Sequence, residues 1–373
     1  MSNLRDRLRR IQEQKSQKPI QMTIDTGSNE KREKDFYLSA LTKCGWESCG
    51  YCVLKRKVNV KSPYKSIKTL PFTLPVLIPD LRSIKLPSIE NFIFFDLETT
   101  GLSSGSGTVA FLAAFGQKIS NLFQITQYLL LDYPGLNDFL ENVLSHFSNN
   151  EKIIVSFNGK CFDSQILKTM CIMNRIPTPE YFHVDLLHPA RRLWKRIINN
   201  CSQSSIETNI LGLDRSGDIS GALAPEIWFD FIKTGKTEKL NQICDHNKAD
   251  ITGLASILSA MIDIAKDPLN VKYKFDIEKL ALYWRKYSRI SDNNPENEII
   301  KKGNKLLKYA AEEKYPKAVY IYGYDQMKNN NYSESLKFVN FGLKLFEKDT
   351  IWHKKLIRRA ENLKRKINRL NKL

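Results

Sequence analysis

The sequence has no run of 18 uncharged apolar residues, so it predicts no membrane-spanning helix. Its first residues, MSNLRDRLRRIQEQKSQKPIQ, lack the apolar segment of a secretory signal. Seven cysteines are scattered along 373 residues, and this odd, dispersed set is typical of a reducing compartment. From these absences we expect a cytoplasmic protein with no membrane partner.

Several kinds of site lack residues that they need. Cys44, Cys49 and Cys52 stand close together, but no further cysteine or histidine lies nearby to complete a structural zinc site. The stretch GSGTVA fits a dinucleotide-binding pattern, but DLETTGLSS separates it from the preceding strand, which it should follow directly. No motif suggests serine–histidine–aspartate chemistry.

Positive charge is plentiful and uneven. The net charge is +18, and residues 1–90 hold 18 Lys and Arg against 9 Asp and Glu. Residues 291–373 hold 19 against 10, whereas residues 91–290 hold 21 of each. Basic flanks around a neutral centre fit a polyanionic partner such as nucleic acid. A chain that is simply rich in Lys, Asn and Ile explains the charge equally well.

The first two segments differ from the rest in composition. Residues 1–35 are polar and charged, which predicts a basic, disordered segment with one short amphipathic stretch, LRDRLRRIQ. Residues 36–90 alternate in polarity and contain five prolines. This pattern indicates irregular or β-hairpin structure that leads into a central domain.

The central and last segments have opposite patterns. In residues 91–268, three strand-like runs precede two strand–helix units and a long amphipathic helix, which predicts an α/β domain with a mixed five-stranded sheet flanked by helices. Residues 269–373 are helical throughout. There KAVYIYGYDQMKNNNYSESLKFVNFGLKLF predicts a helical hairpin with a Tyr–Gly–Tyr cluster, as in tetratricopeptide pairs. We therefore expect a small all-α tetratricopeptide-like module.

Two acids stand at the end of a very apolar strand, in NFIFFDLETTGLSSGSGTVAFLAAFG (91–116). Alternate residues of a strand face the same way, so Asp96 and Glu98 share one side. Two such close carboxylates repel each other, and a divalent cation such as Mg²⁺ or Mn²⁺ removes the repulsion. A solvated strand end is the alternative.

Further polar residues occur where a metal site would need them. Asp163 begins a helix after the strand KIIVSF, and His246 and Asp250 are four residues apart on one helical face. With Asp96 and Glu98 this set meets the needs of two-metal phosphoryl hydrolysis, in which the histidine takes a proton from the attacking water. Alternatively, Asp163 only complements a helix dipole, and His246 and Asp250 form a surface pair.

Three motifs together resemble those of the DEDD, or DnaQ-like, 3′–5′ exonucleases of ribonuclease-H-like fold. They are FFDLETTGL, FNGKCFDSQIL and HNKADI, and the resemblance covers roughly residues 91–265. It implies that two divalent cations, Mg²⁺ or Mn²⁺, are held by Asp96, Glu98, Asp163 and Asp250, and that His246 is the general base. It also implies hydrolysis of single-stranded nucleic acid, DNA or RNA. With TGLSSGSGTVAFLAAFG, HVDLLHPARRLW and the helical tail, the chain further resembles the bacterial YprB-type proteins.

One departure from the family pattern keeps other functions open. In that family a histidine base lies five residues before the last aspartate and a tyrosine lies four before, whereas His246 lies four before Asp250. A non-catalytic nucleic-acid or protein adaptor, with a partner on the helical tail, is one alternative. A structure-specific endonuclease is the other.

Candidate substrate-binding residues surround these motifs. Asp185 ends a strand and is either a further acid near the metals or the N-cap of the next helix. Trp194 stands among basic residues and is either a stacking platform for a base or part of an ordinary amphipathic helix. The turn GLSSGSGT brings backbone N–H groups to the substrate or only joins two strands. The full set is Thr99, Thr100, Gly101, Thr108, Asn158, Lys160, Asp185, Arg191 and Trp194.

Overall fold

The computed structural model describes residues 38–64, 69–101, 107–288 and 298–370. The segment expected to be disordered and most of the turn GLSSGSGT therefore lie outside the described residues. The chain divides into two compact units, Met1–Cys44 and Gly45–Leu373. In the first unit residues 38–43 are helical. All elements named below belong to the second unit.

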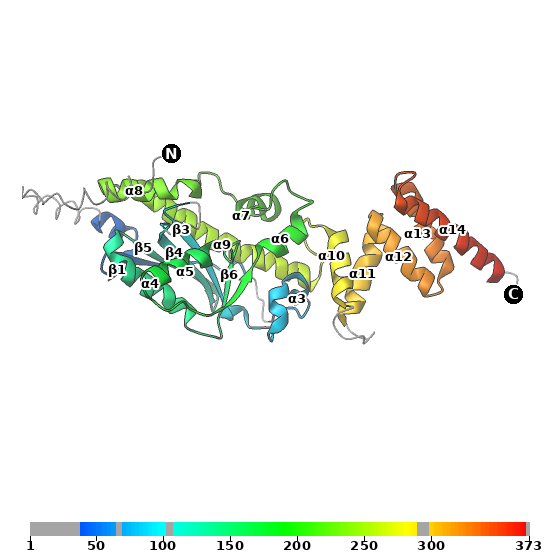
Figure 1. The fold of residues 1–373 in the computed structure, drawn as a ribbon, viewed down its shortest axis with the longest axis horizontal. Coiled ribbons are helices and arrows are strands. Elements are labelled where there is room, and N and C mark those ends of the chain that lie inside the picture. Colours follow the sequence, from blue (N-terminus) through cyan, green and yellow to red (C-terminus); the bar gives the residue numbers. More distant parts are fainter. Residues whose placement is uncertain (1–37, 65–68, 102–106, 289–297, 371–373) are drawn as a thin grey trace, which may run out of the picture. The chain divides into compact units, whose positions relative to one another are not determined.

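A single mixed sheet organises the first part of that unit (Figure 1). Its order is β1-β2-β5-β4-β3-β6-β7, and only the β3–β6 and β6–β7 pairs are parallel. The strands are β1 (Trp46–Gly50), β2 (Val53–Lys61), β3 (Phe92–Thr99), β4 (Ala110–Ile119), β5 (Leu122–Leu130), β6 (Ile153–Ser156) and β7 (Phe182–Asp185).

The expected mixed sheet with flanking helices is confirmed, but its expected count of five strands is wrong. The sheet has seven strands because the hairpin β1–β2, which comes from the lead-in segment, pairs antiparallel with β5. Residues 53–61 pair with residues 122–130 along their whole length. The added hairpin covers what would otherwise be an open edge of β5.

Helices cover both faces of the sheet (Figure 1), and further helices follow α9 in the sequence. The α-helices are α3 (Leu74–Leu77), α4 (Leu136–Leu144), α5 (Asp163–Met173), α6 (Leu187–Trp194), α7 (Gln203–Ile206), α8 (Ala224–Thr234), α9 (Glu238–Lys266), α10 (Ile277–Ser288), α11 (Glu298–Glu312), α12 (Pro316–Lys328), α13 (Tyr332–Leu345) and α14 (Ile351–Leu370). Short 3-10 turns are η1 (Pro79–Ser83), η2 (Ile89–Asn91), η3 (Tyr133–Gly135), η4 (Ser145–Phe147) and η6 (Gly221–Leu223), and η5 (Glu207–Leu211) is a π-helical turn.

Helix α9 lies against β3, β4 and β5 and forms most of the core on that face. Phe94 and Ile251 belong to this core and are fully buried. Gly116 on β4 allows the close approach, because a Cβ there would collide with Ile251 and would lie 2.6 Å from the ring of Phe123. The opposite face carries a second aromatic group, in which Phe95 stacks on Phe115. The site described below lies on the α9 face.

The chain after α9 is helical, as expected. Helices α10 to α14 pack successively, each against the next. Gly323 on α12 lies close to α13, where Tyr322 meets Phe338 with ring centroids 4.8 Å apart. The likeness to a tetratricopeptide pair stays a prediction. Among the described helices, none has the length and apolar character needed to cross a bilayer.

Candidate active site

The parallel strands bring several acids to one edge of the sheet. Strands β3, β6 and β7 run in the same direction, so their carboxyl ends meet there. Asp96 and Glu98 lie in the second half of β3, which ends at Thr99, and the register with β4 shifts directly after Glu98. Asp163 is the first residue of α5, which follows β6, and Asp185 ends β7.

Helix α9 adds two residues to this edge. His246 and Asp250 lie one turn apart, and His246 Nε2 is 3.3 Å from Asp250 Oδ2. Together with Asp96, Glu98 and Asp163 they line one pocket of about 230 Å³. The ligand atoms of Glu98, His246 and Asp250 lie within 4.8 Å of one another, close enough to hold a metal ion. The fold therefore gathers the five residues that the motifs suggest.

The electrostatics of the pocket fit a bound cation. Burial raises the pKa values of Asp96 and Glu98 well above their usual range, and the charges of Asp163 and Asp250 add to this effect. Burial also raises the pKa of Asp163 to about 7. The raised pKa values mean that these carboxylates are not all ionised together unless a positive charge is added to the pocket. A divalent cation supplies that charge, and carboxylate oxygens are ligands that Mg²⁺ and Mn²⁺ prefer.

A line of polar side chains crosses the sheet and ends at Asp96. Arg56, Gln127, Ala114 and Asp96 are successive register partners on β2, β5, β4 and β3. Asn247 of α9 is fully buried and donates to Asp96 Oδ2 at 2.8 Å. Its own Oδ1 accepts from Gln127 Nε2 at 3.0 Å, and Gln127 Oε1 accepts from Arg56 at 2.8 Å. Each buried polar group is therefore satisfied by the next.

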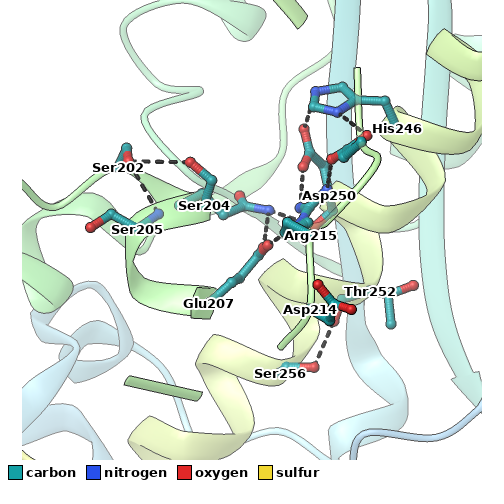
Figure 2. A network of polar contacts seen from close by, with 12 residues as sticks. Ser202, Ser204, Ser205, Glu207, Asp214, Arg215, His246, Asp250, Thr252 and Ser256 are labelled. Atoms are coloured by element: carbon teal, nitrogen blue, oxygen red, sulfur yellow. Dashed lines mark hydrogen bonds and ion pairs between the residues drawn. The ribbon is translucent and has the colours of Figure 1, made fainter. Parts of the chain in front are cut away.

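A second network encloses Asp250 (Figure 2). The Arg215 guanidinium donates to Asp250, to Glu207 at 2.5 Å and to Asp218 at 2.7 Å. Glu207 is fully buried, and Gly253 of α9 leaves the space for its carboxylate, since a Cβ there would collide with it. Burial raises the pKa of Glu207, although its bonds to Arg215 oppose the shift. This network anchors the loop after η5 beside the pocket.

The imidazole of His246 is held from two sides. Its Nδ1 lies 2.9 Å from Asp218 Oδ1, and its Nε2 faces the pocket near Asp250. Gly221 comes close to Nε2, where a Cβ would lie only 3.0 Å away. Because Asp218 engages Nδ1, the nitrogen on the pocket side is Nε2.

The predicted substrate-binding residues on β3 shape the turn that follows it. Thr99 donates to the Gly101 carbonyl at 2.7 Å, and both Thr99 and Thr108 are buried. The Thr100 hydroxyl accepts from the backbone N–H of Val109 at 2.9 Å. These bonds stabilise the turn between β3 and β4, and a contact with substrate stays a prediction.

The loop after β6 is fixed by Asp185. Its carboxylate accepts from the backbone N–H groups of Asn158 at 2.9 Å, Lys160 at 3.1 Å and Leu187 at 3.0 Å. Asn158 lines the acidic pocket and has a left-handed backbone with φ of 67°. The Lys160 ammonium group instead pairs with Asp80 at 3.0 Å. Asp185 is not the N-cap of α6, which is Leu186, but its carboxylate binds the first backbone N–H of that helix and shapes the loop leading to Asp163. A role as a further acid near the metals stays a prediction, and Asp185 is not among the residues that line the acidic pocket.

The expected base stacking on Trp194 is wrong. Its ring is fully buried, and its Nε1 donates to the Lys274 carbonyl at 3.1 Å, so no face is available to a nucleobase. Arg191 is exposed and is not among the residues that line the acidic pocket. The basic residues of α6 therefore belong to an ordinary amphipathic helix, which was the alternative.

Sequence reasoning missed Glu207 and five further residues that support the site. Three of these residues interrupt the apolar face of their own element: Asn247 on α9, Gln127 on β5 and Arg56 on β2. A polar residue within an apolar face can be recognised in the sequence, and it indicates a buried polar contact. Arg215 and Asp218 lie in the polar loop LDRSGDIS, whose composition alone predicts only a turn. The register of the sheet and the path of this loop bring all five beside the acids.

Comparison with known proteins matches the part of the chain that carries this site. Residues 93–262 match the model of the RNase_H superfamily. A stretch of 172 residues is 38% identical to the "Uncharacterized protein YprB" of Bacillus subtilis (strain 168). That stretch is 45% of this chain and 41% of the relative, so the match spans less than half of either protein.

One solved structure is similar at a lower level. It is described as "The structure of exonuclease I suggests how processivity is achieved", is 15% identical and covers 48% of this chain and 41% of that one. Its TM-score is 0.32, too low to support an inference about this chain. The family match and the sheet together show that residues 93–262 form a ribonuclease H-like domain, followed by a helical region.

Proposed function

We propose that this chain is a metal-dependent nuclease of the DEDD type, a 3′–5′ exonuclease that hydrolyses single-stranded nucleic acid. The observation that carries the proposal is the pocket that gathers four carboxylates and His246 at the end of β3. The raised pKa values of Asp96, Glu98 and Asp163 support a site built for cations. The ribonuclease H-like domain and its order of motifs support the same reaction class.

The roles of the residues follow from their positions. Asp96, Glu98, Asp163 and Asp250 would hold two divalent cations, Mg²⁺ or Mn²⁺. When bound, the cations would supply activation of water and neutralisation of charge on the leaving oxygen. His246 Nε2 would accept the proton of the attacking water, and Asp218 would hold the ring through Nδ1. The water oxygen would bond to the terminal phosphorus as the phosphorus–oxygen bond to the 3′ oxygen breaks. The 3′ oxygen would take a proton from solvent, which leaves a 5′-nucleotide and a shortened strand.

A non-catalytic adaptor is the second candidate, and one observation favours it. Arg215 already places a cationic group on Asp250, as a site without metal would require. Each oxygen of a carboxylate has two lone pairs, so Asp250 can pair with Arg215 and still be a metal ligand. The two candidates therefore differ in whether cleavage occurs.

The deciding experiment follows both ends of the substrate. Single-stranded RNA and DNA, labelled at the 5′ or the 3′ end, are incubated with the protein and Mn²⁺, Mg²⁺ or EDTA. Asp96→Asn is the test variant, and Glu141→Gln, at an exposed position of α4, is the matched control. We expect 3′-end shortening that is lost in EDTA and in Asp96→Asn only. Internal fragments would indicate an endonuclease, and binding without cleavage would favour the adaptor.

A further inference from the structure

Helix α14 is the most basic element among the described residues. Its sequence IWHKKLIRRAENLKRKINRL contains eight Lys and Arg against a single Glu. Leu356, Ala360 and Leu363 are buried on one side, in a cluster shared with Val339 of α13. The helix is therefore docked through its apolar stripe, and its charge lies on the remaining surface.

Two of the basic residues belong to that docking. The Arg359 guanidinium lies 4.3 Å from the ring centroid of Tyr320 and 4.8 Å from that of Tyr324, and it donates to the Tyr320 carbonyl at 3.0 Å. The Lys366 ammonium group lies 5.1 Å from the ring centroid of Tyr332. These side chains pack on the aromatic residues of α12 and α13.

Four other basic residues form an outward face. Lys354, Arg358, Arg365 and Arg369 are exposed, and at 3.6 residues per turn they lie on the side opposite the apolar stripe. They span about 22 Å along the helix axis at 1.5 Å per residue. None of the four forms an ion pair with a carboxylate among the residues that the structure describes. Glu361, the single acid of α14, is exposed three residues after Arg358 and four before Arg365, and so borders this face. The four basic residues outnumber it, and a row with such a net positive charge attracts a polyanion.

We propose that this outward face binds the phosphodiester backbone of a single-stranded nucleic acid. The choice of nucleic acid rests on the proposed function, whereas the need for a polyanion rests on the helix alone. Guanidinium groups bind phosphate oxygens through paired hydrogen bonds, so the three arginines suit this ligand. A membrane surface is less suitable, because the apolar stripe that an interfacial helix would insert is already buried against α13.

The test measures binding without cleavage. Fluorescence anisotropy in EDTA follows labelled oligothymidine and oligouridine of about 20 nucleotides, with the full chain, at salt from about 50 to 200 mM. The test variant is Arg358→Glu, Arg365→Glu and Arg369→Glu together. The control, Lys233→Glu, Lys236→Glu and Lys239→Glu, makes the same change of net charge at exposed positions around the end of α8.

We expect the α14 variant to bind at least tenfold more weakly. Its salt slope should fall by about 2, since each lost single-strand phosphate contact removes roughly 0.7. The control should bind within about twofold of the unchanged chain. Thermal melting of both variants checks that α14 remains folded.

Other results overturn the proposal. Equal weakening in both variants would mean that only net charge matters, and unchanged binding would remove α14 from the interface. Binding to phosphatidylserine vesicles but not to oligonucleotides would assign a membrane instead. Cleavage of a trinucleotide with Mn²⁺ is measured separately. If that cleavage is absent while the α14 effect holds, the proposed catalysis fails and the binding surface stands.

Discussion

The side-chain amide of Asn247 lies 2.8 Å from Oδ2 of Asp96 and donates a hydrogen bond to it. Asn247 is fully buried in α9, whereas Asp96 lies within β3, so this bond fixes the helix and the acid relative to each other. Gln127 in turn holds the other end of the Asn247 amide at 3.0 Å. One oxygen of a candidate metal ligand is therefore positioned by the protein before any cation binds.

The first prediction concerns Asn247→Leu. The substitution keeps a similar volume but removes the buried donor of Asp96 and one of the two acceptors of the Gln127 amide, which keeps its bond to the Cys244 carbonyl. We expect the free energy of unfolding to fall by about 1–3 kcal/mol. Mn²⁺ affinity should fall by about 10- to 100-fold, as is usual when a group that orients a metal ligand is removed. Urea denaturation and calorimetric Mn²⁺ titration measure the two effects, with Asn362→Leu, at an exposed position of α14, as the control.

Gln127→Leu tests whether the polar line acts as a unit. If it does, the double variant Gln127→Leu with Asn247→Leu should lose clearly less stability and Mn²⁺ affinity than the sum of the losses in the two single variants. Full additivity, or Mn²⁺ affinity that is unchanged in Asn247→Leu, would mean that Asp96 needs no support from this line.

The second prediction concerns metal binding itself. Mn²⁺ should raise the melting temperature of the chain, because a ligand at 100 times its Kd stabilises the folded state by about 2.7 kcal/mol. The double variant Asp96→Asn with Glu98→Gln should lose this increase while it still melts cooperatively. Differential scanning fluorimetry with Mn²⁺ and EDTA measures both. If Mn²⁺ raises the melting temperature of the double variant as much as that of the unchanged chain, the cation binds elsewhere. The control Glu141→Gln should show the same rise as the unchanged chain.

The third prediction concerns Asp218→Asn. Asp218 holds Nδ1 of His246, so its loss should let the ring turn away from the pocket. We expect kcat for cleavage to fall by about 10- to 100-fold, with KM and Mn²⁺ affinity little changed. Steady-state kinetics on labelled oligonucleotides measure the split, beside Asp230→Asn at an exposed position of α8. An equal fall in kcat in both variants, or a rise in KM with kcat unchanged, would show that Asp218 does not have this role.

The fourth prediction concerns pH and Asp163. Burial raises the pKa of this carboxyl from its ordinary value of 3.8 to about 7 in the metal-free fold. Between these two values the folded chain holds a proton that the unfolded chain has released. The contribution of Asp163 to stability therefore falls as pH rises through this window, by at most about 1.4 kcal/mol per pH unit.

The Asp163→Asn variant isolates this contribution. Without metal, it should be more stable than the unchanged chain at pH 8, and the difference should shrink toward pH 4, where the native carboxyl is protonated. Urea denaturation across this pH range in EDTA measures the difference, and Mn²⁺ should reverse its sign at pH 8. A difference that does not vary with pH would show that Asp163 does not titrate in this window.

The sequence by itself determined the local chemistry of the site. The alternation of β3 places Asp96 and Glu98 on one side, and the spacing of His246 and Asp250 places them on one helical face. Both facts depend only on the repeat of a strand or a helix. The mixed sheet and the helical tail could be predicted for the same reason, because each element carries its own periodicity.

Pairing between distant segments could not be predicted in this way. The hairpin β1–β2 looks like a lead-in when taken alone, and it joins the sheet only because β5 offers an edge over its full length. Trp194 looks available in a basic stretch, yet the Lys274 carbonyl and the surrounding core bury it. Burial depends on what packs against a segment, and the segment itself does not encode that.

The support of the site belongs to the tertiary structure alone. Arg56 and Gln127 are partners because β2 and β5 pair in one register. If β2 slipped by one residue, Arg56 would lie on the opposite face of the sheet from Gln127. Asn247 reaches both Gln127 and Asp96 because the small side chain of Ala114 lies between them in that register. The sequence therefore determined which residues could carry out the chemistry, and only the register of the sheet and the docking of α9 decided which residues hold them in place.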